Sequence, residues 1–235
     1  TVTGRYDGAS NFAANNKWAF FPSAALRWNI SNESFMQGVT WIDDLSLRLS
    51  AGMTGNDAIS AYYSLAALSS TTGGYLFDGS QPVAFYRSRL AQPELTWEKT
   101  ASYNLALDWT LFSGRLALTA EAYTSRTTDL LLTVQVANQT GYSSHFCNLG
   151  EISNKGVELT IDSRNIETKD FQWTTSFTIS HNKQKVIDIG SEDFVTALKS
   201  PGNNGYMMYG YVEGYPLNSL WGFKYGGVWK SDAER

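Results

Sequence analysis

The feature that most constrains this chain is a two-residue alternation of apolar and polar side chains. Between residues 101 and 111 the odd positions carry Ala, Tyr, Leu, Leu, Trp and Leu, and the even positions carry Ser, Asn, Ala, Asp and Thr. Because side chains of a β-strand point alternately to its two faces, this segment would carry one apolar and one polar stripe. The pattern predicts a long strand with one face in a nonpolar environment.

The same alternation recurs in segments 22–30, 45–53, 116–123, 157–162 and 171–180. It predicts an all-β, antiparallel up-and-down meander of about eight strands. The residues expected on the apolar, lipid-directed face are Leu105, Leu107, Leu118, Leu159 and Phe177. Those expected on the polar, lumen-directed face include Arg27, Arg48, Asp108, Glu121, Glu158 and Asp162. A transmembrane β-barrel wall has this alternation of nonpolar and polar faces.

The connections between the expected strands alternate between short and long. The short ones are 112–115 and 165–170, a medium one at 31–43 has a possible helical turn at 31–35, and the long ones are roughly 55–94, 137–154 and 190–205. Outer-membrane barrels have short periplasmic turns and longer extracellular loops. Strands near 45–54, 116–135 and 171–188 are therefore expected to run outward, and those near 18–30, 96–111 and 155–164 inward. Residues 1–7 and roughly 206–230 are expected to supply further strands.

The spacing of two tryptophans can be compared with the thickness of a membrane. Trp97 and Trp109 occupy the same stripe, and twelve residues of strand span about 40 Å. With a tilt of about 40° this projects to about 30 Å, which predicts one tryptophan at each rim of a bilayer. The alternative is a soluble β-sandwich whose core these rings fill, although its strands would ordinarily be shorter.

Composition excludes several classes of protein. Charged residues are 17% of the chain and the net charge is −4, so a nucleic-acid partner is not indicated. One cysteine, Cys147, permits no internal disulfide, and two histidines permit no His-rich metal site. No run of about 18 apolar residues suggests a transmembrane helix. Because Thr1 opens directly onto strand-like sequence, residues 1–235 are not expected to include a signal peptide.

Several runs, in order along the chain, resemble the SusC/RagA family of TonB-dependent outer-membrane transporters. They are residues 5–12, 19–28, 47–56, 93–100, 127–131, 148–159 and 170–173, followed by Asn182-Lys183. In the first two, Asp7-Gly8 is followed by Asn11-Phe12 and then by Phe21-Pro22-Ser23. We interpret these motifs as architectural, with Asn154-Lys155-Gly156 and Thr54-Gly55-Asn56 expected at strand–loop junctions, where Gly and Asn tolerate unusual backbone angles.

The resemblance implies a closed barrel of about 22 strands with an amino-terminal plug and a TonB-contacting segment. Residues 1–235 would then be an internal part of the later barrel, without the plug or the carboxy-terminal strands. It further implies the outer membrane of a Gram-negative bacterium, contact with its lipid, and TonB-driven import of glycans or peptides. The implied partners are a SusD-like surface lipoprotein and, through the absent amino-terminal region, the TonB complex.

No catalytic constellation, cofactor motif or metal-spaced cluster is evident, so the chain is not expected to be an enzyme. Asp43-Asp44 more plausibly ends a turn than binds a cation. The one candidate ligand or partner site is the loop at 55–94, because structureless loops of this length are usually functional or disordered. Its many Tyr, Phe and Leu residues disfavour disorder. Its candidate residues are Tyr62, Tyr63, Tyr75, Phe77, Phe85, Tyr86, Arg87 and Arg89.

Two other functions fit the pattern. A small self-contained barrel, acting as an adhesin or structural protein, fits because eight strands can close. A soluble carbohydrate-binding sandwich also alternates apolar and polar positions. For the candidate loop, the aromatic residues could equally pack the loop on itself.

Overall fold

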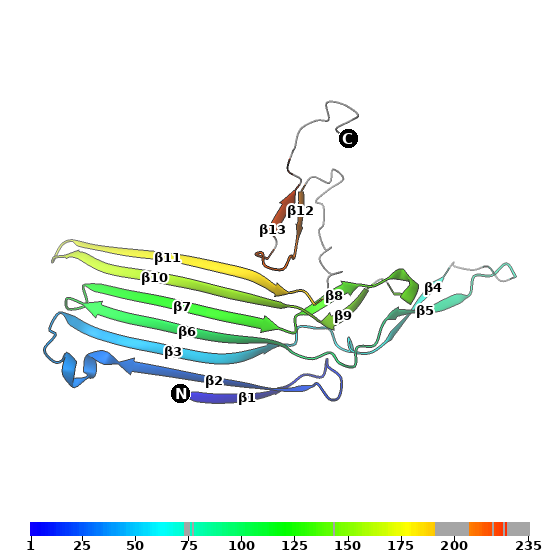
Figure 1. Ribbon diagram of the computed structural model, residues 1–235, viewed down its shortest axis with the longest axis horizontal. Helices are drawn as coiled ribbons and strands as arrows, with labels where there is room; N and C mark the ends of the chain where they lie inside the picture. Colours follow the sequence, from blue (N-terminus) through cyan, green and yellow to red (C-terminus); the bar gives the residue numbers. More distant parts are fainter. Residues whose placement is uncertain are drawn as a thin grey trace, which may run out of the picture.

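The computed structural model contains one long antiparallel sheet with smaller hairpins at one of its ends (Figure 1). The structure describes residues 1–72, 76, 78–142, 144–190, 207–217, 219–222 and 224. The sheet has seven strands in the order β1-β2-β3-β6-β7-β10-β11. Their bounds are β1 Val2–Gly8, β2 Trp18–Asn29, β3 Ile42–Asn56, β6 Glu98–Leu111, β7 Leu116–Thr128, β10 Glu151–Glu167 and β11 Gln172–Asp188.

The predicted meander is confirmed. Every neighbouring pair in the sheet is antiparallel. The strands reach 17 residues, whereas about five or six residues is usual in soluble sheets. Strands of this length follow from unbroken runs of alternating residues with turn residues only at their ends.

Two predicted long connections, between β3 and β6 and between β7 and β10, lie beyond one end of the sheet, which we call the long-loop end. The first contains a further hairpin, β4 Ala67–Thr72 with β5 Val83–Arg89. The second begins earlier than expected, at Asp129, and contains the hairpin of β8 Leu131–Gln135 with β9 Ser144–Asn148. A third hairpin pairs β12 Met207–Gly210 with β13 Ser219–Gly222. Residues 191–206 of the third loop lie outside the described residues.

The opposite, short-turn end holds the connections 30–41, 112–115 and 168–171. The first contains two one-turn 3₁₀ segments, Ile30–Asn32 and Ser34–Met36, close to the predicted helical turn. In the second, Phe112, Ser113 and Gly114 all have positive φ. This backbone reverses the chain within four residues, as a short periplasmic-type turn requires.

One expected strand is divided. The alternation predicts a strand over 116–135, but β7 ends at Thr128 and β8 begins at Leu131. Asp129 between them has a φ of 57°. A left-handed residue cannot continue a strand, so the chain leaves the sheet there and enters the β8–β9 hairpin.

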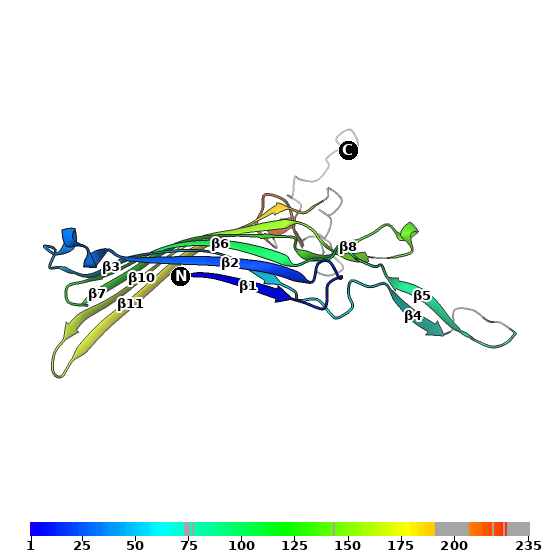
Figure 2. The ribbon, with the colours of Figure 1, turned by 90° about the horizontal axis from the view of Figure 1, so that it is seen from below.

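The sheet is a single curved layer (Figure 2). Within the described residues no second sheet covers its faces, so the sandwich alternative is not what the chain forms. β1 and β11 are the two edges of the sheet, and no strand pairing joins them in the described part of the chain. No described helix is long and apolar enough to cross a membrane.

Candidate functional site

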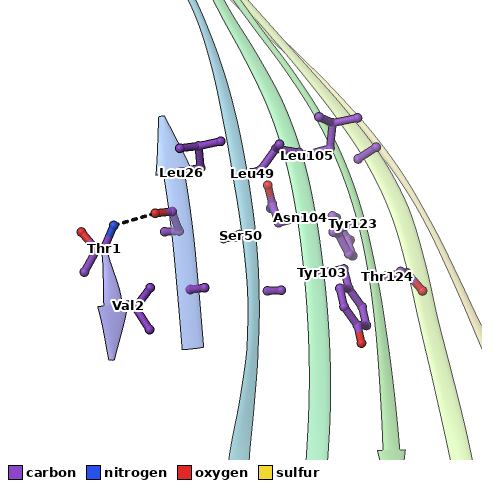
Figure 3. Close-up of a pocket in the computed structure, with 14 residues that line it drawn as sticks. Thr1, Val2, Leu26, Leu49, Ser50, Tyr103, Asn104, Leu105, Tyr123 and Thr124 are labelled. Atoms are coloured by element: carbon purple, nitrogen blue, oxygen red, sulfur yellow. Dashed lines mark hydrogen bonds between the residues drawn. The ribbon is translucent and has the colours of Figure 1, made fainter. Parts of the chain in front are cut away.

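One face of the seven-stranded sheet is apolar from strand to strand. Leu26 of β2 is the Cα partner of Leu49 of β3, which is the partner of Leu105 of β6. Figure 3 shows these leucines in a row across the three strands. Cross-strand partners share a side of a sheet, and we call this side the apolar face. The register places on it the five residues predicted there, Leu105, Leu107, Leu118, Leu159 and Phe177.

The opposite, polar face carries a network of charged and amide side chains. Arg48 donates to Asp108 through Nε at 2.6 Å and Nη2 at 3.0 Å, and Thr119 donates to the same carboxylate at 3.2 Å. Glu121 accepts from the Asn104 amide and is the Cα partner of Glu158. The predicted grouping of Arg48, Asp108, Glu121 and Glu158 on one face is therefore confirmed.

Aromatic side chains mark the two ends of the apolar face. At the short-turn end the Trp41 ring lies 6.2 Å from Trp109 and 6.3 Å from Phe112. At the long-loop end of β2, Trp18 stacks on Tyr6 at 5.2 Å. Trp18 and Trp28 occupy the same face of β2, and ten residues of strand tilted by about 40° span about 25 Å. That distance equals the height of the apolar band of an outer-membrane barrel.

The prediction that Trp97 marks one rim is wrong. β6 begins only at Glu98, and Trp97 is buried at the long-loop end, 5.4 Å from the Phe12 ring and 5.5 Å from Phe21. Its Nε1 donates to the Lys17 carbonyl at 3.1 Å. The alternation continues through Trp97 in the sequence, but the chain has already left the sheet. The residue belongs to a hydrophobic cluster of Ala9, Phe12, Phe21, Leu95 and Trp97, which we call the loop core.

Asparagine side chains tie the long connections to one another around the loop core. Asn148 exchanges two hydrogen bonds with the backbone of Thr96, both at 2.8 Å, and donates a third to the Asp129 carbonyl at 2.8 Å. Asn11 donates to the carbonyls of Asp57 and Ile59. The motif runs at 5–12, 93–100 and 148–159 therefore act as architecture, as interpreted from the sequence, although their contacts join residues far apart in the chain.

Two motif glycines serve close packing rather than unusual backbone angles. Thr54-Gly55-Asn56 forms the end of β3, at a strand–loop junction as expected, whereas Asn154-Lys155-Gly156 lies inside β10. Neither Gly55 nor Gly156 is among the residues with positive φ. A Cβ on Gly156 would lie 2.4 Å from the Tyr123 ring, and one on Gly55 would lie 2.1 Å from Phe21. Each glycine is required because an aromatic ring from a neighbouring strand lies across it.

The base of the candidate loop packs against the loop core. Arg89 donates to the carbonyls of Leu65 at 3.0 Å and Tyr62 at 2.8 Å, and its guanidinium lies 4.5 Å from the centre of the Tyr63 ring. Tyr63 in turn meets Phe146 of β9 edge to face at 5.0 Å. Of the predicted site residues, Tyr63 and Arg89 thus hold the loop in place, as the self-packing alternative anticipated.

The tip of the loop is the β4–β5 hairpin, and its side chains are exposed. Phe85 is 72% exposed, Tyr86 53% and Leu68 69%, and Arg87 is also exposed. Leu68 is the Cα partner of Arg87, so Leu68, Phe85 and Arg87 share one side of the hairpin. Tyr62, 72% exposed, lies at the hairpin base, and Tyr75 and Phe77 lie outside the described residues. The structure therefore separates packed from exposed residues within the predicted site.

Other candidate sites have structural explanations. The Asp43 carboxylate accepts from the Gly114 amide at 2.8 Å and Asp44 accepts from the Ser31 hydroxyl at 3.1 Å, so Asp43-Asp44 fastens turns at the short-turn end. Across the described ranges, no three His, Cys, Asp or Glu residues gather as metal ligands would. Cys147 lies in β9, and burial raises the pKa of its thiol.

Comparison with known proteins gives one consistent result. A family model described as TonB dependent receptor-like, beta-barrel, matches residues 1–234. The chain is 39% identical over 232 residues to TonB-dependent receptor P3 of Formosa agariphila, covering 98% of this chain and 23% of that protein. It is 35% identical to TonB-dependent receptor SusC of Bacteroides thetaiotaomicron, covering 94% of this chain and 23% of SusC.

Solved structures agree with these sequence matches. The chain superposes on the RagAB peptide importer in its closed-closed state with a TM-score of 0.76 and 29% identity, covering 92% of this chain and 22% of that chain. The open-open state gives a TM-score of 0.74. The chain thus spans less than a quarter of the length of the relatives that it matches.

Proposed function

This chain belongs to the TonB-dependent receptor β-barrel family, and from that premise we propose that it forms a sector of the barrel wall of an outer-membrane nutrient importer. The observation that carries the proposal is the seven-stranded sheet with one continuous apolar face bounded by aromatic rings and one charged, hydrogen-bonded face. In a barrel the first would contact lipid and the second would line the lumen. The role is transport rather than catalysis.

The edges of the sheet support a sector rather than a complete small barrel. β1 and β11 are unjoined in the described residues, and an open edge within a bilayer would leave backbone groups without partners. Relatives about four times as long (this chain covers 23% of SusC) could supply the remaining strands. The alternative, a self-contained eight-stranded adhesin or structural barrel, needs a closing pairing that is absent among the described strands.

We propose that the whole receptor imports glycans or peptides, driven by TonB and assisted by a SusD-like surface lipoprotein. The relatives named SusC and RagAB, the latter a peptide importer, motivate this substrate range and partner. The test is a strain lacking the full-length receptor, grown on panels of polysaccharides and of peptides as sole nutrient source. Growth should be lost on one class and restored by the wild-type gene. Unchanged growth and uptake on every member of both panels would overturn the import role.

We also propose that the β4–β5 hairpin presents Leu68, Phe85 and Arg87 to the lipoprotein or to the incoming ligand. These side chains share one side of a hairpin whose base is fixed by Arg89 and Tyr63. Exposed aromatic and arginine side chains on a fixed scaffold are frequent interface anchors.

The hairpin is tested in the full-length receptor by Phe85→Ser with Arg87→Ser, and Gln81→Ser is the matched control because it is exposed on the same hairpin. Outer-membrane levels should be equal for the three proteins. Lipoprotein recovered with the receptor, or uptake, should fall by about tenfold or more in the double variant if these residues are hot spots. Equal recovery and equal uptake would assign the hairpin to packing alone.

A further inference from the structure

A cluster of basic residues lies on the apolar face at its long-loop end. Lys155 of β10 is the Cα partner of Lys183 of β11, and Ser153 is the partner of both Lys185 and Arg126. The register continues Val157–His181 and Leu159–Ile179 on the same side. Four cations from three neighbouring strands, Arg126, Lys155, Lys183 and Lys185, therefore project from the apolar face and are exposed. We call them the basic cluster.

Among the residues that the structure describes, the three lysines of this cluster have no anionic partner. Arg126 forms a two-bond ion pair with Glu151, and the nearby Asp188 carboxylate accepts from the Gly190 amide. Within the described residues no salt bridge or side-chain hydrogen bond is formed by Lys155, Lys183 or Lys185. Like charges directly opposite each other across strands repel, so an anion between Lys155 and Lys183 would stabilise this arrangement.

The height of the cluster matches the outer boundary of the membrane. Trp173 marks the short-turn end of β11, and Lys183 follows it by ten residues on the same face. Ten residues of a strand tilted by about 40° rise by about 25 Å, which is the full height of the apolar band. Lysine side chains at this level can reach the headgroup region while their methylene chains stay in the apolar layer.

An apolar groove of about 650 Å³ begins next to the basic cluster. Its lining includes Leu105, Ala122, Val157, Leu159, Ile179 and His181. Val157 is 56% exposed and Ile179 55% exposed. Ala122 is the cross-strand partner of both Leu105 and Val157, and its small side chain creates the groove between these larger ones. Such a surface can hold hydrocarbon chains lying along the sheet, directly below the lysines.

We propose that this part of the apolar face is a binding site for a phosphate-bearing glycolipid of the outer leaflet. Its phosphates would bind the basic cluster and its acyl chains would lie in the groove. Ammonium groups form charge-assisted hydrogen bonds with phosphate. Lys155 and Lys183 lie opposite each other, and Lys185 lies at the next same-side position of β11. Three lysines at two levels match a headgroup with more than one phosphate better than a singly charged phospholipid. The proposal rests on the proposed outer-membrane location.

The test uses the full-length receptor, purified from outer membranes, stripped of lipid in detergent, and placed in nanodiscs of phosphatidylethanolamine with a small fraction of lipid A. Retained lipid A is measured by mass spectrometry for the wild type and for Lys155→Gln/Lys183→Gln/Lys185→Gln. The control removes three cations from the opposite end, Arg115→Gln/Arg164→Gln/Lys169→Gln, which are all exposed. Retention should fall about tenfold or more in the first variant, as expected from losing charge-assisted hydrogen bonds, and stay unchanged in the control.

A second variant tests the groove with the lysines intact. Ala122→Phe would fill the groove with a side chain that lipid tolerates, whereas Ala24→Phe changes the same face on a distant strand. Retention should fall only for Ala122→Phe. Folding is verified for each variant by its outer-membrane level.

Three results would overturn the proposal. Equal lipid A retention by the wild type and the lysine variant removes the site while leaving the proposed transport function intact. An equal loss when phosphatidylglycerol replaces lipid A shows a general anionic surface rather than a glycolipid site. A receptor absent from the outer membrane would instead refute the proposed function on which the site depends.

Discussion

At the scale of single residues, the face of the sheet on which a side chain lies decides whether a charge is tolerated there. Leu105 and Asn104 are consecutive, yet Leu105 aligns with Leu49 on the apolar face while Asn104 donates to Glu121 on the polar face. A charge is costly on a lipid-contacting side because lipid offers it neither water nor a counter-charge, whereas water in a lumen solvates it.

We therefore predict opposite tolerance to the same substitution at positions three apart. In the full-length receptor, Leu105→Arg should lower the free energy of unfolding by about 2–4 kcal/mol if Leu105 lies near the middle of the bilayer. Ser102→Arg, on the polar face opposite Gly52, should change it by less than about 1 kcal/mol. Denaturant titration in lipid vesicles measures both, and equal costs would contradict the assignment of the two faces.

A second residue-scale prediction concerns Cys147, which lies in the β8–β9 hairpin beyond the sheet. Burial raises the pKa of its thiol, so less of the reactive thiolate is present at any pH below that pKa. Alkylation by iodoacetamide at pH 8 should be slower than at a cysteine introduced by Gln81→Cys in a Cys147→Ser background. The rate at Cys147 should also keep rising to higher pH, and identical rate–pH profiles would show that burial does not protect the thiol.

At the scale of elements, the loop core explains how hairpins far from the sheet are held in place. Trp97, Phe12 and Phe21 come from three different segments and pack together. Asn148 bonds to the backbone of Thr96, just before β6, and of Asp129, just before β8. A partly buried side-chain amide that hydrogen-bonds to backbone groups stabilises the fold, because leaving those N–H and C=O groups unpaired away from water costs free energy.

Loss of the Asn148 amide should loosen the long connections without unfolding the sheet. Asn148→Ala removes three hydrogen bonds, leaving the Thr96 and Asp129 backbone groups unpaired at a local cost of about 1–3 kcal/mol. Faster amide hydrogen exchange is expected in residues 57–97 and 129–150 of the full-length receptor, but not in β6 or β7. Asn182→Ala, an exposed change within β11, is the control and should leave exchange at the loops unchanged.

At the scale of the whole molecule, the open sheet makes this chain dependent on the rest of a barrel. Both faces of the sheet are uncovered in the described residues, and β1 and β11 are edge strands with no described strand on their outer sides. Isolated edges of this length promote association with other strands.

Residues 1–235 expressed alone should therefore aggregate rather than form a pore. Size-exclusion chromatography without detergent should show soluble aggregates or no soluble protein, and conductance across lipid bilayers should be absent. A monodisperse, detergent-free monomer with cooperative melting would contradict both this expectation and the membrane location.

The sequence alone determined the long strands of the sheet and their two faces, because alternation is a local property of extended backbone and needs no knowledge of distant residues. Its motif runs indicated the family, but the hairpins within the long connections and the division of the expected 116–135 strand were not predicted. Only the tertiary structure decided which side chains meet. Trp97 looked like a membrane-rim residue, but it packs in the loop core against Phe12 and Phe21 and donates to the carbonyl of Lys17, which is 80 residues away. Position 156 must be glycine because the Tyr123 ring of β7 lies across it. Arg126 and Lys183 come to lie in one cluster only because of the register between β7, β10 and β11. Such contacts depend on strand register and on where the chain leaves the sheet, which period-two patterning leaves open.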